Sequence, residues 1–476
     1  MRPNSRGAMC EGLLVVLLWC LALGTPANAQ EELPIPVDRY RLDNGLRVVL
    51  STDPSTPVVS VAVYYDVGSR NETRGRSGFA HLFEHMMFQG SASVGKMEHF
   101  QLINAVGGSA NGTTGPDRTN YYQTLPSHQL GLALWLEAER MNSLAVTAQN
   151  FENQRAVVIN EYRQSYENAP YGLSFLRINE LAYGDYFPYA NPTIGTVTDL
   201  NQATWEDARA FWQQWYGPNN AVLAIVGDFE PGEARRLVEQ HFGSIAPRDV
   251  PSWEDPGFAG QSAEQQETRA DRLATLPLFF QVYHIPPSRH ADHYPLELLA
   301  VILGDGESSR LHRVLVEERQ VCMQVRAYTD DRRGPDLINV EGVVAAGHRP
   351  EEARALTNEV IGQLVRQGVT ERELAKARNR ARAYFVFGLQ TTLQRAKHLA
   401  EFELYFGDAA LLRGELNQYL QVTAEQVQQV AARYLVANNR TVLDTLPAAM
   451  VEQAAEGAST PGPSTQPEAT EEETAQ

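Results

Sequence analysis

The sequence predicts an α+β protein built from two homologous α/β sandwich domains, each with a mixed, mainly antiparallel sheet packed against helices. Its 476 residues exceed one ordinary domain, and 43% apolar residues with only 21% charged residues are enough for two globular units. The chain also resembles itself at a constant offset of 219 in the numbering, which indicates an internal duplication. Strand-like and helix-like segments are grouped rather than strictly alternating, which favours antiparallel sandwiches over a parallel doubly wound sheet.

Two separated pairs of segments support the duplication. VSVAVYYDVGS and LFFQVYHIPPS match at this offset, which aligns Val63 with Val282. TWEDARAFWQQWYGPNN and TAEQVQQVAARYLVANN match at the same offset, from Thr204 and Thr423 onwards. Runs such as LRVVL, NYYQTL and AVLAIVG predict strands, and longer helical periods such as HQLGLALWLEAERMNS and TERELAKARNRARAYFVF predict helices.

Composition sets the boundaries between these parts. The two domains are expected at 34–245 and 273–447. The segment 246–272 is rich in Pro, Gly and polar residues without a sustained period, so it is interpreted as a linker. Residues 448–476 carry acidic side chains and no Lys or Arg, and they are expected to form a disordered tail. The formal net charge of −18 argues against nucleic acid as a partner, because binding phosphate needs a basic surface.

Residues 1–29 are interpreted as a signal peptide that directs export to the periplasm. Arg2 and Arg6 precede a short apolar run, and the small residues of the ANA segment offer a cleavage site. An uncleaved membrane anchor is the alternative, but the run is shorter than the roughly 18–20 residues that a spanning helix needs. No stable membrane anchor is therefore expected. Cleavage would leave Cys322 as the remaining cysteine, so no internal disulfide is expected.

The stretch GFAHLFEHMMFQGS contains a candidate metal site. On a helix His81 and His85, four residues apart, share one face and can direct two imidazole nitrogens at one ion. Glu84 beside them offers a carboxylate that can take a proton from water, as a hydrolytic zinc site requires. The order H-x-x-E-H is the inverzincin signature. Chance matching of three positions has odds of roughly one in a hundred, so a surface helix with incidental His and Glu stays open without a third ligand.

A third ligand is expected from another helix, because catalytic zinc is usually held by three protein side chains. The segment ENQRAVVINEYRQSYEN offers Glu152, Glu161 and Glu167. Helical geometry places Glu161 on the face of two valines and turns the other two acids away from it. Since a carboxylate on an apolar stripe must be paired or bound to metal, Glu161 is the predicted third ligand.

With Glu161 following the histidine motif on a separate, later helix, the pattern resembles the pitrilysin and insulinase family of zinc peptidases. The likeness covers the chain from about Leu33 to Leu446, both repeats included. It implies one zinc ion (Zn2+) per chain, held by the two histidines and Glu161, with Glu84 as the general base. Many members carry a second glutamate seven residues before the third ligand, where this sequence has Gln154.

The second repeat carries none of the three motif residues. Moving the motif by the repeat offset gives Ala300, Leu303 and Gly304, within an apolar helical segment. The second domain is therefore expected to lack metal ligands. His290 and His293 lie three apart at the start of that segment, but no third acid ligand accompanies them in the sequence, so they are interpreted as surface or capping residues.

A glycine-rich segment between Gly107 and Pro126 is a candidate substrate-binding strand. Its small residues let another backbone approach closely, so an extended peptide could add to it by strand pairing. An ordinary glycine-rich turn before a core strand fits the pattern equally well. The resemblance favours the substrate strand, and it implies that Asn111, Gly112 and Thr113 contact the substrate.

The family resemblance also implies a substrate-holding Arg and Tyr seven residues apart on a helix of the second domain. Arg395 is present in LQRAKHLAEFELYFGD, but Phe402 stands where the tyrosine is expected, and phenylalanine has no hydroxyl to donate. Tyr405 is one possible substitute. The folded part of this chain is half of the chamber that the long family members build. We therefore expect a heterodimer with a homologous zinc-less chain that supplies the Arg/Tyr pair, with a homodimer as the alternative.

Together these patterns predict an exported zinc-dependent endopeptidase that hydrolyses peptides or unfolded polypeptides within a two-chain chamber. Two other readings stay open. A non-catalytic structural or assembly subunit of a peptidase-like complex would not need the zinc ligands that this chain keeps. A zinc hydrolase acting on non-peptide esters would keep the metal but would give no role to strand pairing.

Overall fold

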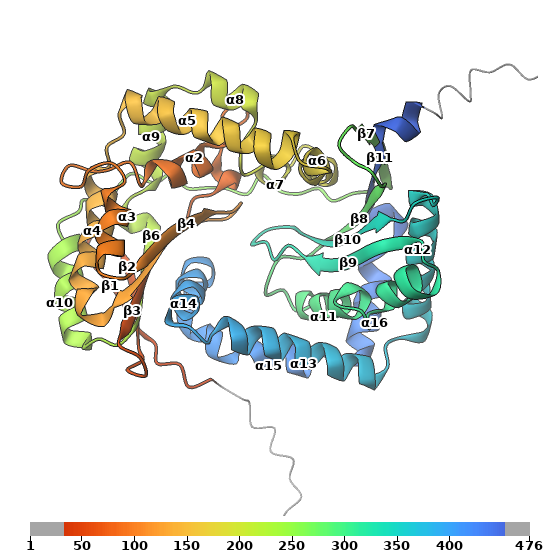
Figure 1. The fold of residues 1–476 in the computed structure, drawn as a ribbon. Helices are drawn as coiled ribbons and strands as arrows, with labels where there is room; N and C mark the ends of the chain where they lie inside the picture. Colours follow the sequence, from red (N-terminus) through yellow and green to blue (C-terminus); the bar gives the residue numbers. More distant parts are fainter. Residues whose placement is uncertain (1–32, 453–476) are drawn as a thin grey trace, which may run out of the picture.

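The computed structural model describes residues 33–452, which form two halves that face one another (Figure 1). The predicted signal peptide and the part of the predicted tail beyond residue 452 lie outside the described residues. Residues 448–452, also assigned to the tail, are helical and follow the last strand directly. Within 33–452, no helix is both long enough and apolar enough to cross a membrane.

The first half contains a six-stranded sheet and the helices around it. Its strands are β1 (Asp38–Arg41), β2 (Arg47–Thr52), β3 (Val58–Tyr65), β4 (Ser109–Thr114), β5 (Thr119–Pro126) and β6 (Ala221–Gly227). Its helices are α2 (Phe79–Met86), α3 (Glu98–Ala105), α4 (Leu130–Ser143), α5 (Ala148–Tyr162), α6 (Gly172–Tyr183), α7 (Phe187–Ala190), α8 (Val197–Gln202), α9 (Trp205–Trp215) and α10 (Pro231–Phe242).

The second half contains a five-stranded sheet. Its strands are β7 (Gln265–Asp271), β8 (Leu278–Ile285), β9 (Cys322–Thr329), β10 (Asp336–Val344) and β11 (Arg440–Pro447). Its helices are α11 (His293–Gly304), α12 (Pro350–Gln367), α13 (Glu371–Gly388), α14 (Thr392–Phe406), α15 (Glu415–Gln421) and α16 (Ala424–Tyr434).

The two sheets have the same topology. The strand orders are β1-β2-β6-β3-β5-β4 and β7-β11-β8-β10-β9. In each sheet one pair is parallel, β2 with β6 and β7 with β11, and the other pairs are antiparallel. Five strands of the first sheet thus have a counterpart in the second. The predicted fold class, two α/β sandwiches from an internal duplication, is confirmed.

Strand β7 corrects the predicted linker. The linker was expected to run from 246 to 272, but its last part, Gln265–Asp271, pairs in parallel with β11 and is the counterpart of β2. The prediction failed because β7 is an edge strand with mostly exposed, polar side chains, so its composition is that of a loop.

The register of the strands corrects one detail of the repeat alignment. Leu223 and Val442 are equivalent at the offset of 219, and their partners on the neighbouring strands are Val63 and Gln281. The central strands therefore match at an offset of 218, and the alignment of Val63 with Val282 slips by one residue. A slip of one residue moves a side chain to the other face of a sheet, and these two valines do lie in cores on opposite faces.

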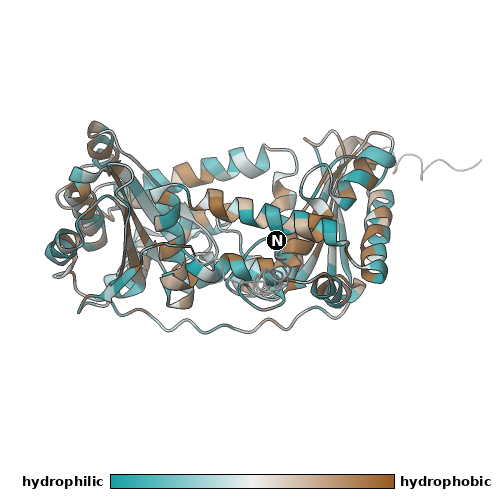
Figure 2. Ribbon diagram, turned by 90° about the horizontal axis from the view of Figure 1, so that it is seen from below, coloured by the Kyte–Doolittle hydropathy of each residue, from teal (hydrophilic) through white to brown (hydrophobic). Residues whose placement is uncertain are grey.

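Each half lends a helix to the sheet of the other half. Helix α14 of the second half packs on the inner face of the first sheet, where Val49, Ala62 and Tyr64 point. Helix α6 of the first half packs on the inner face of the second sheet. Both faces of each sheet are therefore buried, which explains why the central strands β6 and β8 are buried along their whole length and consist mostly of apolar residues. Figure 2 shows the brown, hydrophobic strands of the two sheets at opposite ends of the molecule.

Candidate metal centre

Helix α2 carries the two histidines, and a buried glutamate fixes its start. Glu72 accepts hydrogen bonds from the backbone N–H of Gly78 at 2.9 Å and of Ala80 at 2.8 Å, and from the side-chain amide of Asn191 at 2.7 Å. These N–H groups belong to the first turn of α2 and the residue before it, where a helix has no donor partners of its own. Burial raises the pKa of Glu72 to about 8, although the hydrogen bonds act in the opposite direction. Glu72 therefore positions α2 as a polar anchor.

The predicted ligands converge between α2 and α5. His81 Nε2 lies 3.7 Å from Glu161 Oε1, and His85 Nε2 lies 3.4 Å from Glu161 Oε2. The three ligand atoms all lie within 4.8 Å of one another. Tetrahedral zinc with bonds of roughly 2.0–2.1 Å places its ligand atoms about 3.4 Å apart. The spacing of these three side chains therefore fits a zinc ion without rearrangement of either helix.

The protonation states also suit a metal. Burial, with His85 acting in the same direction, lowers the pKa of His81 to about 4. His81 is thus neutral near pH 7, with a nitrogen lone pair to offer. The hydrogen bond with His85 lowers the pKa of Glu161, so that carboxylate is ionised. Metal binding requires neutral imidazole and ionised carboxylate, and both are present here.

Glu84 lies between the histidine pair and the edge strand β4. Thr114 Oγ1 donates a hydrogen bond of 2.7 Å to Glu84 Oε2, and burial raises the pKa of Glu84. A Cβ added at Gly112 would lie 3.1 Å from Glu84 Cγ, a tight contact. The glycine thus gives Glu84 room beside the strand. The hydrogen bond from Thr114 was not anticipated, because nothing in the sequence pairs that hydroxyl with an acid on a distant helix.

Strand β4 ends the first sheet, so among the described strands its outer edge has no partner. Asn111 lies on β4 and lines a cavity with Glu84 and His85. Thr113 is already engaged, because its hydroxyl donates to Asn120 at 2.7 Å and its carbonyl accepts from Arg118 at 2.9 Å. Of the three predicted substrate contacts, the structure brings Asn111 and Gly112 next to Glu84 and ties the side chain of Thr113 to β5 and its turn.

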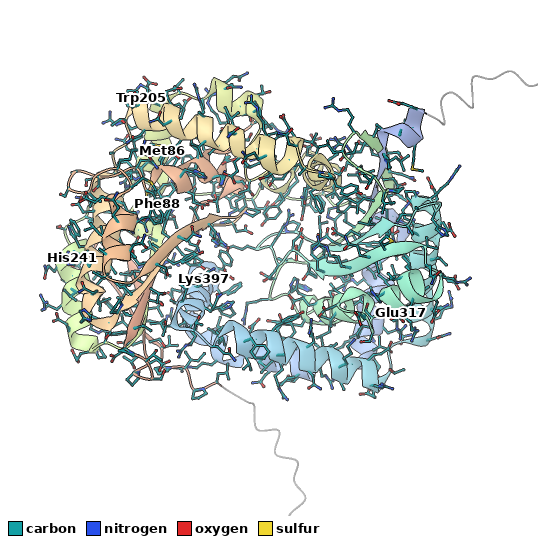
Figure 3. All side chains as sticks on the ribbon, viewed as in Figure 1. Met86, Phe88, Trp205, His241, Glu317 and Lys397 are labelled. Carbon is teal, nitrogen blue, oxygen red and sulfur yellow. The ribbon has the colours of Figure 1, made fainter. Side chains whose placement is uncertain are left out.

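A cavity of about 360 Å³ opens beside Glu84. Phe88, Met97 and Phe100 supply its apolar wall, and Gln154 is among its polar lining residues. Figure 3 labels Phe88 close to α3, near the end of α2 that Met86 marks. Sequence reasoning did not identify this apolar wall. The MMF run directly after the motif was the available signal for Phe88, whereas no pattern pointed to Met97 or Phe100.

Arg395 is not brought to this cluster. Its guanidinium forms an ion pair with Asp53, which follows β2. Strands β2 and β4 are four positions apart in the sheet, which is roughly 19 Å at the usual strand spacing. Phe402 is buried against Phe406, and the guanidinium of Arg333 lies 5.2 Å from the ring centroid of Tyr405. Within one chain, none of these α14 side chains is placed opposite the three ligands.

Comparison with known proteins gives two family matches. Residues 47–196 match the family described as insulinase (peptidase family M16), and residues 202–381 match the peptidase M16 inactive domain. The chain is 31% identical over 441 residues to a protein of Helicobacter pylori named zinc protease PqqE, which covers 91% of this chain and 97% of that protein.

Solved structures share the fold. A protease from Helicobacter pylori superposes with a TM-score of 0.82 at 27% identity, covering 87% of this chain and 100% of the other. The periplasmic protease PqqL from Escherichia coli has the same fold, with a TM-score of 0.72 at 17% identity. That match covers 94% of this chain but only 53% of PqqL.

Proposed function

Because the chain belongs to the insulinase family of peptidases, family M16, we propose that it is a zinc-dependent endopeptidase acting on peptides or unfolded polypeptides. One observation carries the proposal. Three side chains with the spacing and protonation of a zinc site meet beside a carboxylate, and this group lies against a sheet edge that has no partner among the described strands. The names of relatives such as the Helicobacter pylori zinc protease support the same chemistry.

The chain's own residues supply the proton transfer. Zinc, when bound by His81, His85 and Glu161, lowers the pKa of water and polarises a carbonyl. Glu84 accepts a proton from water and returns it to the leaving amine. Its partial burial keeps its proton affinity above that of an exposed carboxylate, and the hydrogen bond from Thr114 holds one oxygen in place.

The free edge of β4 is the proposed seat of the substrate backbone. An extended peptide pairs with such an edge through main-chain hydrogen bonds, and neighbouring pockets then select side chains. The cavity beside Glu84 has an apolar wall and would take one large hydrophobic side chain of the peptide. An ester without an extended backbone would use none of these features.

We further propose that two chains form the chamber. The match to only 53% of PqqL supports a half-length protein that must assemble to enclose a peptide. A homologous zinc-less partner would supply the Arg/Tyr pair, because Phe402 has no hydroxyl and Arg395 is held by Asp53. A homodimer is the alternative. Location in the periplasm, through the signal peptide, belongs to the same proposal, and the likeness to PqqL, which is named a periplasmic protease, supports it.

Zinc analysis beside a fluorogenic peptide assay tests the proposal. Wild-type protein should hold zinc at the site formed by His81, His85 and Glu161, and it should cleave peptide, with or without a co-purified partner chain. Glu161→Gln should lose both properties, whereas Glu152→Gln, an exposed acid on the same helix, should keep both. Zinc binding without any cleavage, even with the partner present, would favour the structural subunit. Full cleavage by Glu161→Gln would refute the zinc site.

A further inference from the structure

We propose that the second half contains a separate divalent-cation site formed by His293, Glu297 and Asp331. His293 Nε2 lies 3.3 Å from Glu297 Oε1 and 3.6 Å from Asp331 Oδ1. These distances match those of the first cluster, 3.4 and 3.7 Å, and the roughly 3.4 Å between ligands of tetrahedral zinc. The three ligand atoms also lie within 4.8 Å of one another.

The orientation of the imidazole is the second observation. His293 is only 1% exposed, so it is not the surface residue that the sequence suggested. Its Nδ1 lies 3.2 Å from the carbonyl oxygen of Pro286, to which it donates. Its Nε2 is buried, has no hydrogen-bond partner of good geometry, and points at the two carboxylates. Histidines that bind metals are commonly oriented by such a hydrogen bond from the other ring nitrogen.

Groups of both signs surround the cluster. Asp336 Oδ2 lies 3.9 Å from His293 Nδ1, and the Tyr419 hydroxyl faces Glu297. The basic side chains nearby are the buried Arg332 and, on the wall of the same cavity, Arg289 and His398. A proton is the competing occupant. Burial lowers the pKa of His293, but Asp331 and Glu297 outweigh burial and raise that pKa to about 11. A metal ion and a proton would therefore satisfy the same two carboxylates.

The cluster has room for further ligands. His293 and Asp331 line a cavity of about 140 Å³, well above the roughly 10–15 Å³ that one water needs. The side chain of Asp331 is 61% exposed, which leaves a path for an ion from solvent. One imidazole with two carboxylates suits Zn2+ or Mn2+ better than Ca2+ or Mg2+. Zn2+ is therefore a suitable probe of the cluster.

The proposed ion would fasten the turn between β9 and β10. This turn carries Asp331 and, next to it, Arg332 and Arg333, which reach the first half. Arg332 donates to Asn179 at 2.7 Å, and Arg333 pairs with Asp66 at 2.8 Å. A cation that joins Asp331 to α11 would therefore stabilise the contact between the halves. Its role is structural and independent of peptide cleavage.

Metal counting in a variant without the first site tests the inference. The full chain with His81→Ala and His85→Ala is equilibrated with Zn2+, dialysed, and analysed by mass spectrometry. We expect about one Zn2+ per chain to remain, and a rise in Tm when Zn2+ is added. Adding Glu297→Gln should weaken zinc binding about tenfold or more and remove the rise in Tm.

Matched controls keep the test decisive. Adding His290→Ala or Glu307→Gln, both exposed residues near α11, should leave the remaining zinc unchanged. Circular dichroism checks that each variant is folded. A folded double-histidine variant that binds no Zn2+ overturns the inference but leaves the first site intact as a proposal. Equal zinc binding with and without Glu297→Gln overturns it as well.

Discussion

The two halves share one topology but separate their edge helix and edge strand by different amounts. In the first half α2 lies beside β4 with the side chain of Glu84 between them, in contact with Gly112 and Thr114. In the second half α11 lies directly against β9. A Cβ added at Gly304 would come 2.1 Å from the backbone nitrogen of Ala327, so there is no room for any side chain.

This difference explains why the repeat lacks ligands. The positions equivalent to the histidine motif hold Ala, Leu, Ile or Gly whether the offset is 218 or 219, and nearly every residue of α11 is buried. Helix α2 instead leaves His81, Glu84 and His85 partly exposed. One copy of the arrangement is packed for stability, while the other keeps a space about one side chain wide between helix and strand. The side chain of Glu84, the proposed general base, occupies that space.

The largest effect is expected for Glu84→Gln. The variant keeps the shape of the side chain but cannot accept a proton, so kcat should fall about 10²- to 10⁴-fold. Zinc content should not change, because the three ligands are intact. Steady-state kinetics with metal analysis measures both. Wild-type turnover by this variant would remove Glu84 from the proposed mechanism.

Gly112→Ala should affect activity more than stability. The new methyl group would press on Glu84 and on the ring of Tyr121, each 3.1 Å away, and shift the carboxylate by a fraction of an ångström. We expect kcat/KM to fall roughly tenfold or more, since small misplacements of catalytic groups are costly. Gly115→Ala, whose added Cβ would make only an ordinary contact of 3.9 Å with Arg118, is the control that should retain activity. Equal activity of the two variants would show that spacing at β4 does not matter.

Gly304→Ala should instead affect stability more than activity. Its methyl group would meet the backbone of β9, so we expect a loss of about 3 kcal/mol in the free energy of unfolding. Denaturant unfolding measures this loss. Gly414→Ala is the control, because a Cβ added there would have no neighbouring atom within 4 Å. The folded fraction should still bind zinc at the first site. Unchanged stability would contradict the close packing of α11 on β9.

The smallest effect concerns pH and the interface of α6 with the second sheet. His284 Nε2 donates to the carbonyl of Ala182 on α6 at 2.9 Å, whereas the described strands of the first sheet contain no histidine. Burial lowers the pKa of His284 to about 4, below the unfolded value near 6.5. The neutral form therefore contributes stability above pH 6.5, and this contribution is lost as the pH falls towards 4.

We expect the contribution of His284 to the free energy of unfolding to be about 2 kcal/mol smaller at pH 5 than at pH 7. His284→Gln, which retains a donor but does not titrate, should show a correspondingly smaller loss. His128→Gln should behave as wild type. Denaturant unfolding at the two pH values provides the measurement, and an identical pH response of wild type and His284→Gln would contradict the assignment.

The sequence predicted the features that depend on local pattern. The strands with both faces buried are rich in apolar residues, and the helices have clear periods, so the fold class followed from the order of these segments. The face of Glu161 was predicted from helical geometry, and the structure places this acid beside both histidines. The prediction assumed that Val157 and Val158 form a buried apolar stripe on this face. Val158 is buried, but Val157 is 46% exposed.

Features that depend on tertiary contact were not predictable from pattern. Strand β7 looks like a linker because its side chains face solvent and only its backbone pairs. Glu72 caps α2 from a position well before the helix, outside the spacing of any capping motif. Of the acids beside His293, Glu297 lies one helical turn later on α11, where it was overlooked, and Asp331 lies on the turn after β9, too far along the chain for any spacing to connect it with the histidine.

The exchange of helices between the halves has a consequence for biosynthesis. The inner face of the first sheet is complete in sequence once β6 has been made, but the helix that covers it, α14, begins only at Thr392. At roughly 5–20 residues per second, a ribosome needs about 10–30 s to synthesise the segment between them. During this time the apolar inner face of the first sheet lacks the helix that covers it in the complete fold.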